Sequence, residues 1–451
     1  MRKFPQRHPA GPSHGRVAQS HPLSPQGGLG SSANARFFMP VPHRPRCTLH
    51  RSFAATLPVL SLFFWAVATT SVRAASPVTA PKLPTNWPSP PPIAAKALVV
   101  MDAKTGQILA ERNPNLRVQP ASLAKIMTFD LALRAIHDGQ FTPQSTVTVG
   151  MAAWKVALNP NASRMFLQIG TKVSMKDLLI GLMVPSGDDA AVQVADSVAG
   201  SQAAFVAEMN REARRLGLSN THFENASGLG APGQYSTALD MAVLTHHLIT
   251  TYPNFKTYTD IQWFTWNHIT QQNFNRLVGV VPWVTGLKSG HLGGPDFHLV
   301  TTAQKGSRSL IGVVLGTPSL MSSASESESL LNWAFHSFHP ESVPLSRIPT
   351  TQTVYEGTTG QVSLALNGGD ALPNQVDVPT IWGRTGPIHV RVRLKPEVVA
   401  PVRQGEVLGS VAILAGSHSL ERRTIVAKSA VPQGGFFAVL FGRIALLFRH
   451  L

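Results

Sequence analysis

The sequence predicts an α/β (α+β) core, in which one sheet is covered by a cluster of helices, followed by a small all-β module. Short apolar strands lie near residue 100 and again near residue 300, and a long stretch with helical spacing separates them. Short alternating segments follow residue 350. With 451 residues, 43 % of them hydrophobic, the chain can bury a large core and is long enough for two or three domains.

The net charge does not indicate a nucleic-acid-binding protein. The formal charge is +16, but the first 74 residues hold nine Lys or Arg and neither Asp nor Glu. The remainder carries 30 basic and 23 acidic residues, a net charge of +7, with no long Lys/Arg run and no interleaving of basic with aromatic residues. We therefore expect no nucleic acid among the partners. The mild positive balance would suit an anionic membrane surface.

Residues 1–74 are predicted to be a disordered extension followed by a secretory signal peptide. The part before Met39 is rich in Pro, Gly, Ser and His and cannot bury apolar surface. A basic segment, His43–Arg51, precedes the apolar run Phe53–Thr69, and small residues then predict cleavage after Ala74. Met39 is an alternative start, and a retained membrane anchor is the alternative to cleavage.

The folded part is expected to begin near Ile93, after a Pro-rich extended spacer at residues 75–92. Ala97–Asp102 and Gln107–Glu111 are short apolar strands on either side of a turn at residues 103–106. This pattern predicts a β-hairpin.

A mainly helical stretch follows, and a second pair of strands closes the core. Ser174–Met183 begins with a capping box, and Asp189–Ala199 and Gln202–Leu216 show helical spacing. His298–Ala303 and Ser309–Gly316 are predicted strands joined by a Lys-Gly turn. The order of strands, helices and strands predicts one large domain at residues 93–340.

The C-terminal quarter of the chain has a different character. After a Pro-containing join, residues 350–432 contain short alternating segments such as Ile388–Leu394 and are predicted to form a small β-rich domain. Residues 435–451 are strongly apolar but are interrupted by two arginines. We expect this segment to be an amphipathic anchor at a membrane interface, since it is too short and too charged to span a bilayer. The alternative is a helix docked on its own protein.

A serine and a lysine three positions apart are the first candidates for chemistry. A cysteine nucleophile is excluded because the only cysteine, Cys47, lies in the predicted signal peptide. Ser122 and Lys125 precede an apolar periodic stretch at 126–136, so they should share one face in the first turn of a buried helix. Such a lysine can accept the hydroxyl proton if it is neutral. Alone, the spacing equally fits a capping serine followed by a surface lysine.

Two further segments contain catalytic residue types. Ser186–Asp188 forms a turn between two apolar helices, and Lys288–His291 stands in front of the strand that begins at His298. Together the three segments read Ser-Leu-Ala-Lys, Ser-Gly-Asp and Lys-Ser-Gly.

In this order and at about these separations, the segments resemble the Ser-x-x-Lys, Ser-Gly-Asn and Lys-Thr-Gly motifs of penicillin-recognising serine enzymes. Three more stretches are similar to the low-molecular-mass penicillin-binding proteins, the D-alanyl-D-alanine carboxypeptidases of peptidase family S11. They are Asn220–Leu229, Gly233–Ala242 and Leu330–Trp333. The similarity runs from about residue 93 to 338. It implies a penicillin-binding-protein/β-lactamase-like transpeptidase domain with an antiparallel sheet and a helical cluster.

The resemblance implies a serine-type carboxypeptidase that removes the terminal D-alanine from peptidoglycan stem pentapeptides. Ser122 would be the nucleophile, Lys125 its general base, and Ser186 a relay that carries a proton to the departing amine. β-Lactam antibiotics would be covalent inhibitors. Neither a metal nor an organic cofactor would be needed, and the mature protein would act at the periplasmic face of the cytoplasmic membrane.

The resemblance also implies a set of substrate-binding residues. Lys288 would supply positive charge and Ser289 a hydroxyl for the terminal carboxylate, next to Gly290. The backbone N–H of His291, with that of the nucleophile, would form the oxyanion hole. Asp188 would belong to this set at the third position of the second motif.

Two departures from the family pattern bear on activity. Asp188 replaces the usual Asn, and an ionised carboxylate there would favour the protonated forms of Lys125 and Lys288. We therefore hypothesise that activity depends on neutralising Asp188, by an acidic medium or by its own pairing. Residues 317–329 contain no basic residue, whereas the family often places an arginine there. Ser289 in place of Thr keeps the hydroxyl.

Two other functions remain open at this point. One is a D,D-endopeptidase of the same superfamily that cuts cross-links, which the β-rich module argues against loosely. The other is a catalytically impaired wall-binding scaffold, which the altered Ser-Gly-Asp motif makes possible.

Overall fold

The computed structural model describes residues 87–449 except 347, 367–371, 381–386 and 417. The predicted extension and signal peptide, and most of the Pro-rich spacer, lie outside the described residues. The predicted fold class is confirmed, since the described chain combines an antiparallel sheet and helices with a separate β-rich region toward the C-terminus.

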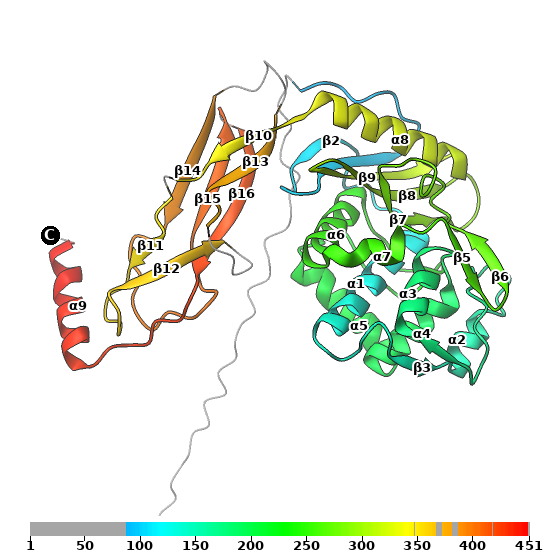
Figure 1. The fold of residues 1–451 in the computed structure, drawn as a ribbon, viewed down its shortest axis with the longest axis horizontal. Coiled ribbons are helices and arrows are strands. Elements are labelled where there is room, and N and C mark those ends of the chain that lie inside the picture. The colour runs from blue at the N-terminus through cyan, green and yellow to red at the C-terminus, as the bar shows by residue number, and fades with distance from the viewer. Residues whose placement is uncertain (1–86, 347, 367–371, 381–386, 417, 450–451) are drawn as a thin grey trace, which may run out of the picture. The chain divides into compact units, whose positions relative to one another are not determined.

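A five-stranded antiparallel sheet forms the centre of the first region (Figure 1). Its strand order is β2-β1-β9-β8-β7. The strands are β1 (Ala97–Asp102), β2 (Ile108–Arg112), β7 (Val284–Gly290), β8 (Phe297–Lys305) and β9 (Arg308–Thr317). The two predicted strand pairs are thus confirmed within one or two residues, and β1 joins them by pairing with β9.

The helices lie on both faces of this sheet, most of them on one (Figure 1). They are η1 (Ala121–Ala124), α1 (Lys125–His137), α2 (Met151–Val156), α3 (Met175–Met183), α4 (Asp188–Ala199), α5 (Gln202–Arg215), α6 (Ala238–Thr251), η2 (Pro253–Phe255), α7 (Lys256–Thr259) and α8 (Leu320–Ser337). Two small hairpin-like sheets complete the region: β3 (Thr146–Thr148) with β4 (Lys172–Ser174), and β5 (Trp263–Trp266) with β6 (Ile269–Gln272).

Strand β1 shows why both faces are covered. All six of its residues are buried. Val99 and its alternate neighbours pack into the core shared with α1, α3, α4 and α6, whereas Leu98 and Val100 pack into the core that includes α8. Because successive side chains of a strand point to opposite faces, a continuous apolar run requires apolar partners on each side.

The predicted capping box at the start of α3 is confirmed. The Ser174 hydroxyl accepts a hydrogen bond from the Asp177 backbone N–H at 3.0 Å. This bond satisfies one of the N–H groups that lack a partner inside the helix. It fixes where α3 starts and therefore where the turn between α3 and α4 begins.

The β-rich region has its own apolar core, formed by residues between Val343 and Val431. One sheet has the strand order β11-β12-β16-β15-β14, and a two-stranded sheet pairs β10 with β13. The strands are β10 (His339–Pro344), β11 (Thr351–Thr353), β12 (Gln361–Leu366), β13 (Gln375–Thr380), β14 (Ile388–Leu394), β15 (Val407–Ala415) and β16 (His418–Ala427).

The last described element is α9 (Phe436–Arg449). Its large apolar side chains are exposed to solvent. The apolar face of a helix docked on its own protein would instead be buried. Within the described ranges, no helix has both the length and the hydropathy that a bilayer-spanning segment requires.

Candidate active site

Ser122 lies in a tight turn immediately before α1. We expected it in the first turn of the α-helix, but the structure places it in the 3-10 turn η1. The preceding residue, Ala121, has a φ of 51°, in the left-handed region that side chains other than glycine rarely adopt. Neither η1 nor α1 has a side-chain cap. Ser122 is therefore not a capping serine, and its hydroxyl is free for another role.

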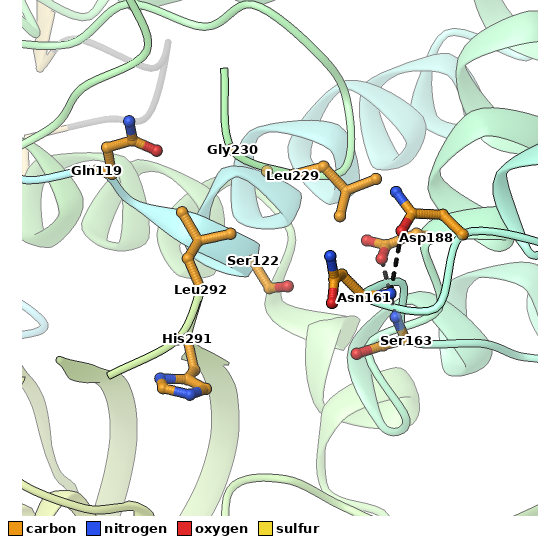
Figure 2. Close-up of a pocket in the computed structure, with 12 residues that line it drawn as sticks. Gln119, Ser122, Asn161, Ser163, Asp188, Leu229, Gly230, His291 and Leu292 are labelled. Atoms are coloured by element: carbon orange, nitrogen blue, oxygen red, sulfur yellow. Dashed lines mark hydrogen bonds between the residues drawn. The ribbon is translucent and has the colours of Figure 1, made fainter. Parts of the chain in front are cut away.

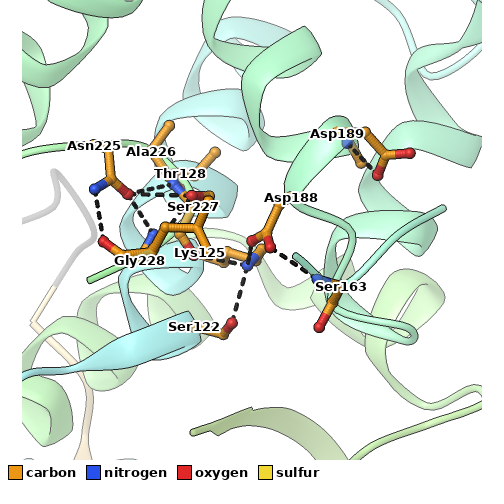
Figure 3. Close-up of polar contacts among 12 residues, drawn as sticks. Ser122, Lys125, Thr128, Ser163, Asp188, Asp189, Asn225, Ala226, Ser227 and Gly228 are labelled. Carbon is orange, nitrogen blue, oxygen red and sulfur yellow. Dashed lines mark hydrogen bonds and ion pairs between the residues drawn. The ribbon is translucent and has the colours of Figure 1, made fainter. Parts of the chain in front are cut away.

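Lys125 is fully buried and makes three short contacts (Figure 3). Its Nζ lies 3.0 Å from Ser122 Oγ, 2.6 Å from Asp188 Oδ1 and 2.7 Å from the carbonyl oxygen of Ser227. The alternative of a surface lysine is therefore wrong.

These contacts suit an amine that exchanges a proton with Ser122. A carbonyl oxygen and a carboxylate oxygen can only accept, so Ser227 and Asp188 each take one N–H of Lys125. The remaining position of the nitrogen is directed at Ser122 Oγ. It holds a third N–H when the lysine is protonated and a lone pair when it is neutral, so the same geometry serves both states.

Asp188 is the first residue of α4, and both of its carboxylate oxygens have partners. Oδ1 contacts Lys125, and Oδ2 accepts from the Ser163 backbone N–H at 2.9 Å. The Asp188 N–H in turn donates to the Ser163 carbonyl oxygen at 2.8 Å. The structure thus pairs Asp188 with Lys125. Of the two ways in which Asp188 could be neutralised, an acidic medium or pairing with another group, the structure shows pairing.

Ser186 occupies the turn between α3 and α4. It is 3 % exposed and has a φ of 60°. This conformation is costly for a residue with a side chain and persists only when the surroundings fix it. The turn places Ser186 two positions before Asp188.

The third motif lies in front of β8, as expected, and is itself part of a strand, β7, which the sequence did not indicate. Lys288, Ser289 and Gly290 are the last three residues of β7, antiparallel to β8. A side chain at Gly290 would place its Cβ 2.8 Å from the carbonyl oxygen of Pro120. Only glycine lets β7 approach the turn that carries Ser122 this closely.

Lys288 is fully buried, and its Nζ donates to the Ser289 carbonyl oxygen at 3.0 Å. Burial holds the pKa of this lysine well below its usual range, the nearby Lys125 lowers it further, and Asp188 opposes the shift. A buried amine in this state gains much from an added negative charge close by.

A pocket of about 650 Å³ opens at Ser122 (Figure 2). It is lined by Gln119, Ser122, Asn159, Asn161, Ser163, Asp188, Gly228, Leu229, Gly230, His291, Leu292 and Gly293. Of the predicted site residues, Ser122, Asp188 and His291 line it, while Lys125 and Lys288 are fully buried and do not.

His291 lines the pocket. Its ring lies away from the Ser122 hydroxyl in Figure 2 and stacks on Phe297, with 3.8 Å between the ring centres. The side chain is therefore not placed for acid–base chemistry on Ser122. This arrangement leaves the backbone N–H as the group through which His291 could act.

Sequence reasoning missed the role of the loop at residues 225–228. The Asn225 side-chain oxygen accepts from the Gly228 backbone N–H at 2.7 Å, which shapes the loop. Gly228 has a φ of 85°, and a Cβ there would lie 1.8 Å from the Ala121 carbonyl oxygen. The Gly-Leu pair in this loop was a signal, but its contact with the turn of Ser122 follows only from the fold.

One group of potential metal ligands lies away from this pocket. Asp130, Glu212 and His247 bring oxygen and nitrogen atoms within 4.8 Å of one another. However, the Arg215 guanidinium contacts both carboxylate oxygens of Glu212 and lies 3.3 Å from His247 Nε2. A positive group therefore already occupies the position that a metal ion would take, and we assign no ion to it.

A family model described as "D-alanyl-D-alanine carboxypeptidase", Peptidase S11, matches residues 85–319. The chain belongs to the S11 family. All three motifs and the pocket fall within the matched residues. The family membership predicted from the motifs is therefore confirmed.

Individual S11 relatives match most of the chain. The D-alanyl-D-alanine carboxypeptidase DacC of Escherichia coli K12 is 35 % identical over 414 residues, covering 89 % of this chain and 98 % of the relative. Among solved structures, penicillin binding protein 5 from Haemophilus influenzae has 33 % identity and a TM-score of 0.63, covering 76 % of this chain and 99 % of that one. Penicillin binding protein 6B from Escherichia coli has 33 % identity and a TM-score of 0.59, covering 78 % and 99 %.

Proposed function

We propose that this protein is a serine-type D-alanyl-D-alanine carboxypeptidase that removes the terminal D-alanine from peptidoglycan stem pentapeptides through an acyl-enzyme on Ser122. The observation that carries the proposal is the 3.0 Å contact between Lys125 Nζ and Ser122 Oγ beside the pocket. Family membership supplies the substrate class, since relatives that match nearly end to end carry this name.

In the acylation step, Ser122 Oγ attacks the carbonyl carbon of the penultimate D-alanine. Its proton passes to Lys125, which must be neutral at that moment. The carbonyl electron pair moves onto oxygen, where the backbone N–H groups of Ser122 and His291 stabilise it. Ser186 then relays a proton from Lys125 to the nitrogen of the leaving D-alanine as the C–N bond breaks.

The terminal carboxylate of the substrate binds beside the end of β7. Ser289 supplies a hydroxyl, and the buried Lys288 supplies positive charge once the carboxylate favours its protonated form. Gly290 lets this strand end approach the turn of Ser122, since a Cβ added there would lie only 2.8 Å from the Pro120 carbonyl oxygen. The carboxylate is thereby recognised close to the scissile bond.

Water completes the reaction by hydrolysing the ester on Ser122. A β-lactam would acylate the same oxygen, but its leaving group would stay attached after the ring opens and would hinder the water. Penicillins and related antibiotics are therefore proposed as covalent inhibitors. The structural neighbours of this chain include proteins named penicillin binding proteins, which supports this extension.

The protein is proposed to be secreted across the inner membrane and to work at the periplasmic face of the cytoplasmic membrane. The sequence pattern of a signal peptide supports export. The exposed apolar side chains of α9, with Arg443 beside them, support contact with the membrane interface.

A fluorescent penicillin and a synthetic stem pentapeptide test the proposal together. The mature protein should be labelled covalently and should release D-alanine. The Ser122→Ala variant should do neither, although its thermal unfolding midpoint should equal that of the native protein. Labelling without D-alanine release, but with cleavage of a cross-linked peptide, would instead make it an endopeptidase. If the native protein shows neither labelling nor D-alanine release, the wall-binding scaffold is the remaining hypothesis.

A further inference from the structure

His298 connects the central sheet to the segment that carries Ser122. It lies on β8, directly opposite Gly290 of β7 in the antiparallel register, and is 3 % exposed. Its Nε2 lies 3.1 Å from the carbonyl oxygen of Gln119, and its Nδ1 lies 2.9 Å from the backbone N–H of Gly316 at the end of β9.

These two partners fix the protonation state of the ring. A backbone N–H can only donate, so Nδ1 accepts from Gly316 and carries no proton. A carbonyl oxygen can only accept, so Nε2 carries the proton and donates it to Gln119. The neutral ring with its proton on Nε2 satisfies both bonds, and the doubly protonated ring cannot, because two N–H groups would then face each other at Gly316.

The segment that His298 holds is under conformational strain. It runs from Gln119 through Pro120 and Ala121 to Ser122, and Ala121 has a φ of 51°. Strained backbone persists only when its neighbours over-determine it. Here Gly228 and Gly290 limit the segment by close packing, whereas His298 supplies a directed bond three residues before the nucleophile.

We propose that His298 is a positioning residue for the S11 reaction, which holds the strained turn so that Ser122 points at the substrate carbonyl and which releases that turn when the ring becomes protonated. The inference rests on the proposed role of Ser122 as nucleophile. His298 is not itself a pocket-lining residue but bonds to Gln119, which is one, so its effect is transmitted through the Gln119 backbone.

The charges around His298 set the direction of its response to pH. Burial lowers the pKa of His298 below its ordinary value of 6.5, and Lys96 and His291 add to this, while Asp296 and the Gln119 carbonyl oppose it. Lys96 and Asp296 form an exposed ion pair at 3.3 Å, so Lys96 partly offsets the larger effect of Asp296. The bond to Gly316 is therefore intact at neutral pH and is lost when acidification protonates the ring, which happens at a lower pH than for an ordinary histidine.

Three variants separate positioning from simple stability. His298→Leu keeps the bulk and removes both bonds, whereas His298→Gln has an amide N–H at the distance of Nε2 and cannot become charged. His246→Leu is the matched control. That ring is half-buried, its Nδ1 lies 3.0 Å from the Ala103 carbonyl oxygen, and it lies outside the pocket.

The measurement is the rate constant for covalent labelling by a fluorescent penicillin, with thermal unfolding recorded for each variant. At pH 7.5 we expect His298→Leu to label about tenfold or more slowly, and His298→Gln and His246→Leu to label within about threefold of the native rate. Equal rates in His298→Leu and the native protein would overturn the proposal, as would equal slowing in His246→Leu.

Protonation is tested by the ratio of native to His298→Gln labelling rates between pH 7.5 and 4.5. Because other ionisations act on both proteins alike, the ratio isolates His298. It should fall as the pH decreases below 6.5, and a constant ratio would overturn the release step. Failure of the native protein to label at all would contradict the proposed function instead, so the two failures are distinguishable.

Discussion

At the scale of single residues, the pairing of Asp188 with Lys125 is the feature that most alters the chemistry of this site. The two groups are 2.6 Å apart and almost without exposure to solvent. An anion at that distance stabilises the ammonium form of Lys125, yet the proposed acylation needs the free amine. The ion pair therefore neutralises the charge of Asp188 but disfavours the free amine of Lys125 that acylation needs.

We predict that Asp188→Asn moves the rising limb of the pH–rate profile for acylation to lower pH. The amide carries no charge, so Lys125 loses its proton more readily. The measurement is the penicillin-labelling rate from pH 5 to 9 for the native protein and the variant. Asp196→Asn, on the same helix but outside the pocket, should leave the profile unchanged, and superimposable native and Asp188→Asn curves would reject the hypothesis.

Asp130 is a second unusual residue, on the buried side of α1. It is 1 % exposed, and neither of its carboxylate oxygens has a hydrogen-bond partner among the described residues. Burial, with a contribution from Glu212, raises its pKa to about 7. The folded protein therefore binds a proton at Asp130 that the unfolded chain releases near its ordinary value of 3.8.

The sign of the resulting pH dependence follows from this raised pKa. Below about pH 4 the carboxyl is protonated in both states, and its effect on stability is fully favourable. Between pH 4 and 7 the unfolded chain ionises first, so the free energy of unfolding should fall by a few kcal/mol. Asp130→Asn should remove this decline, and the exposed Asp138→Asn should not. Urea unfolding at several pH values provides the measurement, and an unchanged decline in Asp130→Asn would contradict the assignment.

At the scale of elements, the turn η1 depends on two glycines from distant parts of the chain. Gly228 comes from the loop before α6 and Gly290 from the end of β7, and both approach the backbone of residues 120–121. Neither glycine has a side chain to take part in the reaction. Their absent side chains are what allow a loop and a strand to close around the nucleophile.

We predict that Gly228→Ala reduces the acylation rate roughly 100-fold, because a methyl group 1.8 Å from the Ala121 carbonyl oxygen must displace the turn that carries Ser122. The control is Gly200→Ala, at the end of α4. It has a similar φ of 77° but no atom within 4 Å of the added Cβ. Both variants should lose some stability, and only Gly228→Ala should lose activity. Equal labelling by the two would show that the close approach does not matter.

The elements that could be predicted from the sequence are those in which the pattern of apolar and polar residues matches the burial that the fold gives them. The strands Ala97–Asp102 and Ile388–Leu394 were expected with the bounds that the structure gives them. By contrast, β7 was not recognised as a strand, because it contains a lysine and two glycines. Two of these residues are explained only by tertiary contacts. Lys288 is buried beside a second lysine, and Gly290 packs against Pro120.

The candidate site follows the same division. The motifs identified Ser122, Lys125 and the turn at Ser186, since spacing along a helix or turn is written into the sequence. Asp188 was expected near Lys125, but the other partners of these residues were not predictable. Ser227 contributes a backbone oxygen, for which side-chain chemistry gives no signal, and His298 acts through a bond to a residue 179 positions away.

At the scale of the whole molecule, α9 presents an apolar stripe to solvent. Side chains at every third or fourth position share one face, and five of them are 63 to 75 % exposed: Phe436, Phe437, Phe441, Leu447 and Phe448. A stripe of this kind on a 14-residue helix suits a membrane interface better than a bilayer-spanning position.

We predict that the mature protein sediments with vesicles containing anionic lipid and that a chain ending at Gly434 stays in the supernatant. Phe437→Glu with Phe441→Glu should weaken sedimentation in the full-length protein, because a charged group within the stripe opposes burial in lipid. Labelling by a fluorescent penicillin should be the same for all three proteins. Equal sedimentation with and without α9 would exclude it as the anchor.

The pairing of β1 with β9 also governs when the enzyme first becomes reactive. Ala97 lies opposite Leu315, so the two strands that hold the centre of the sheet together come from opposite ends of the first region. Contacts between such distant segments form late, since a long loop must close before they contribute. A nascent chain should thus be inert toward both peptidoglycan and antibiotic until β9 has been synthesised and has paired with β1.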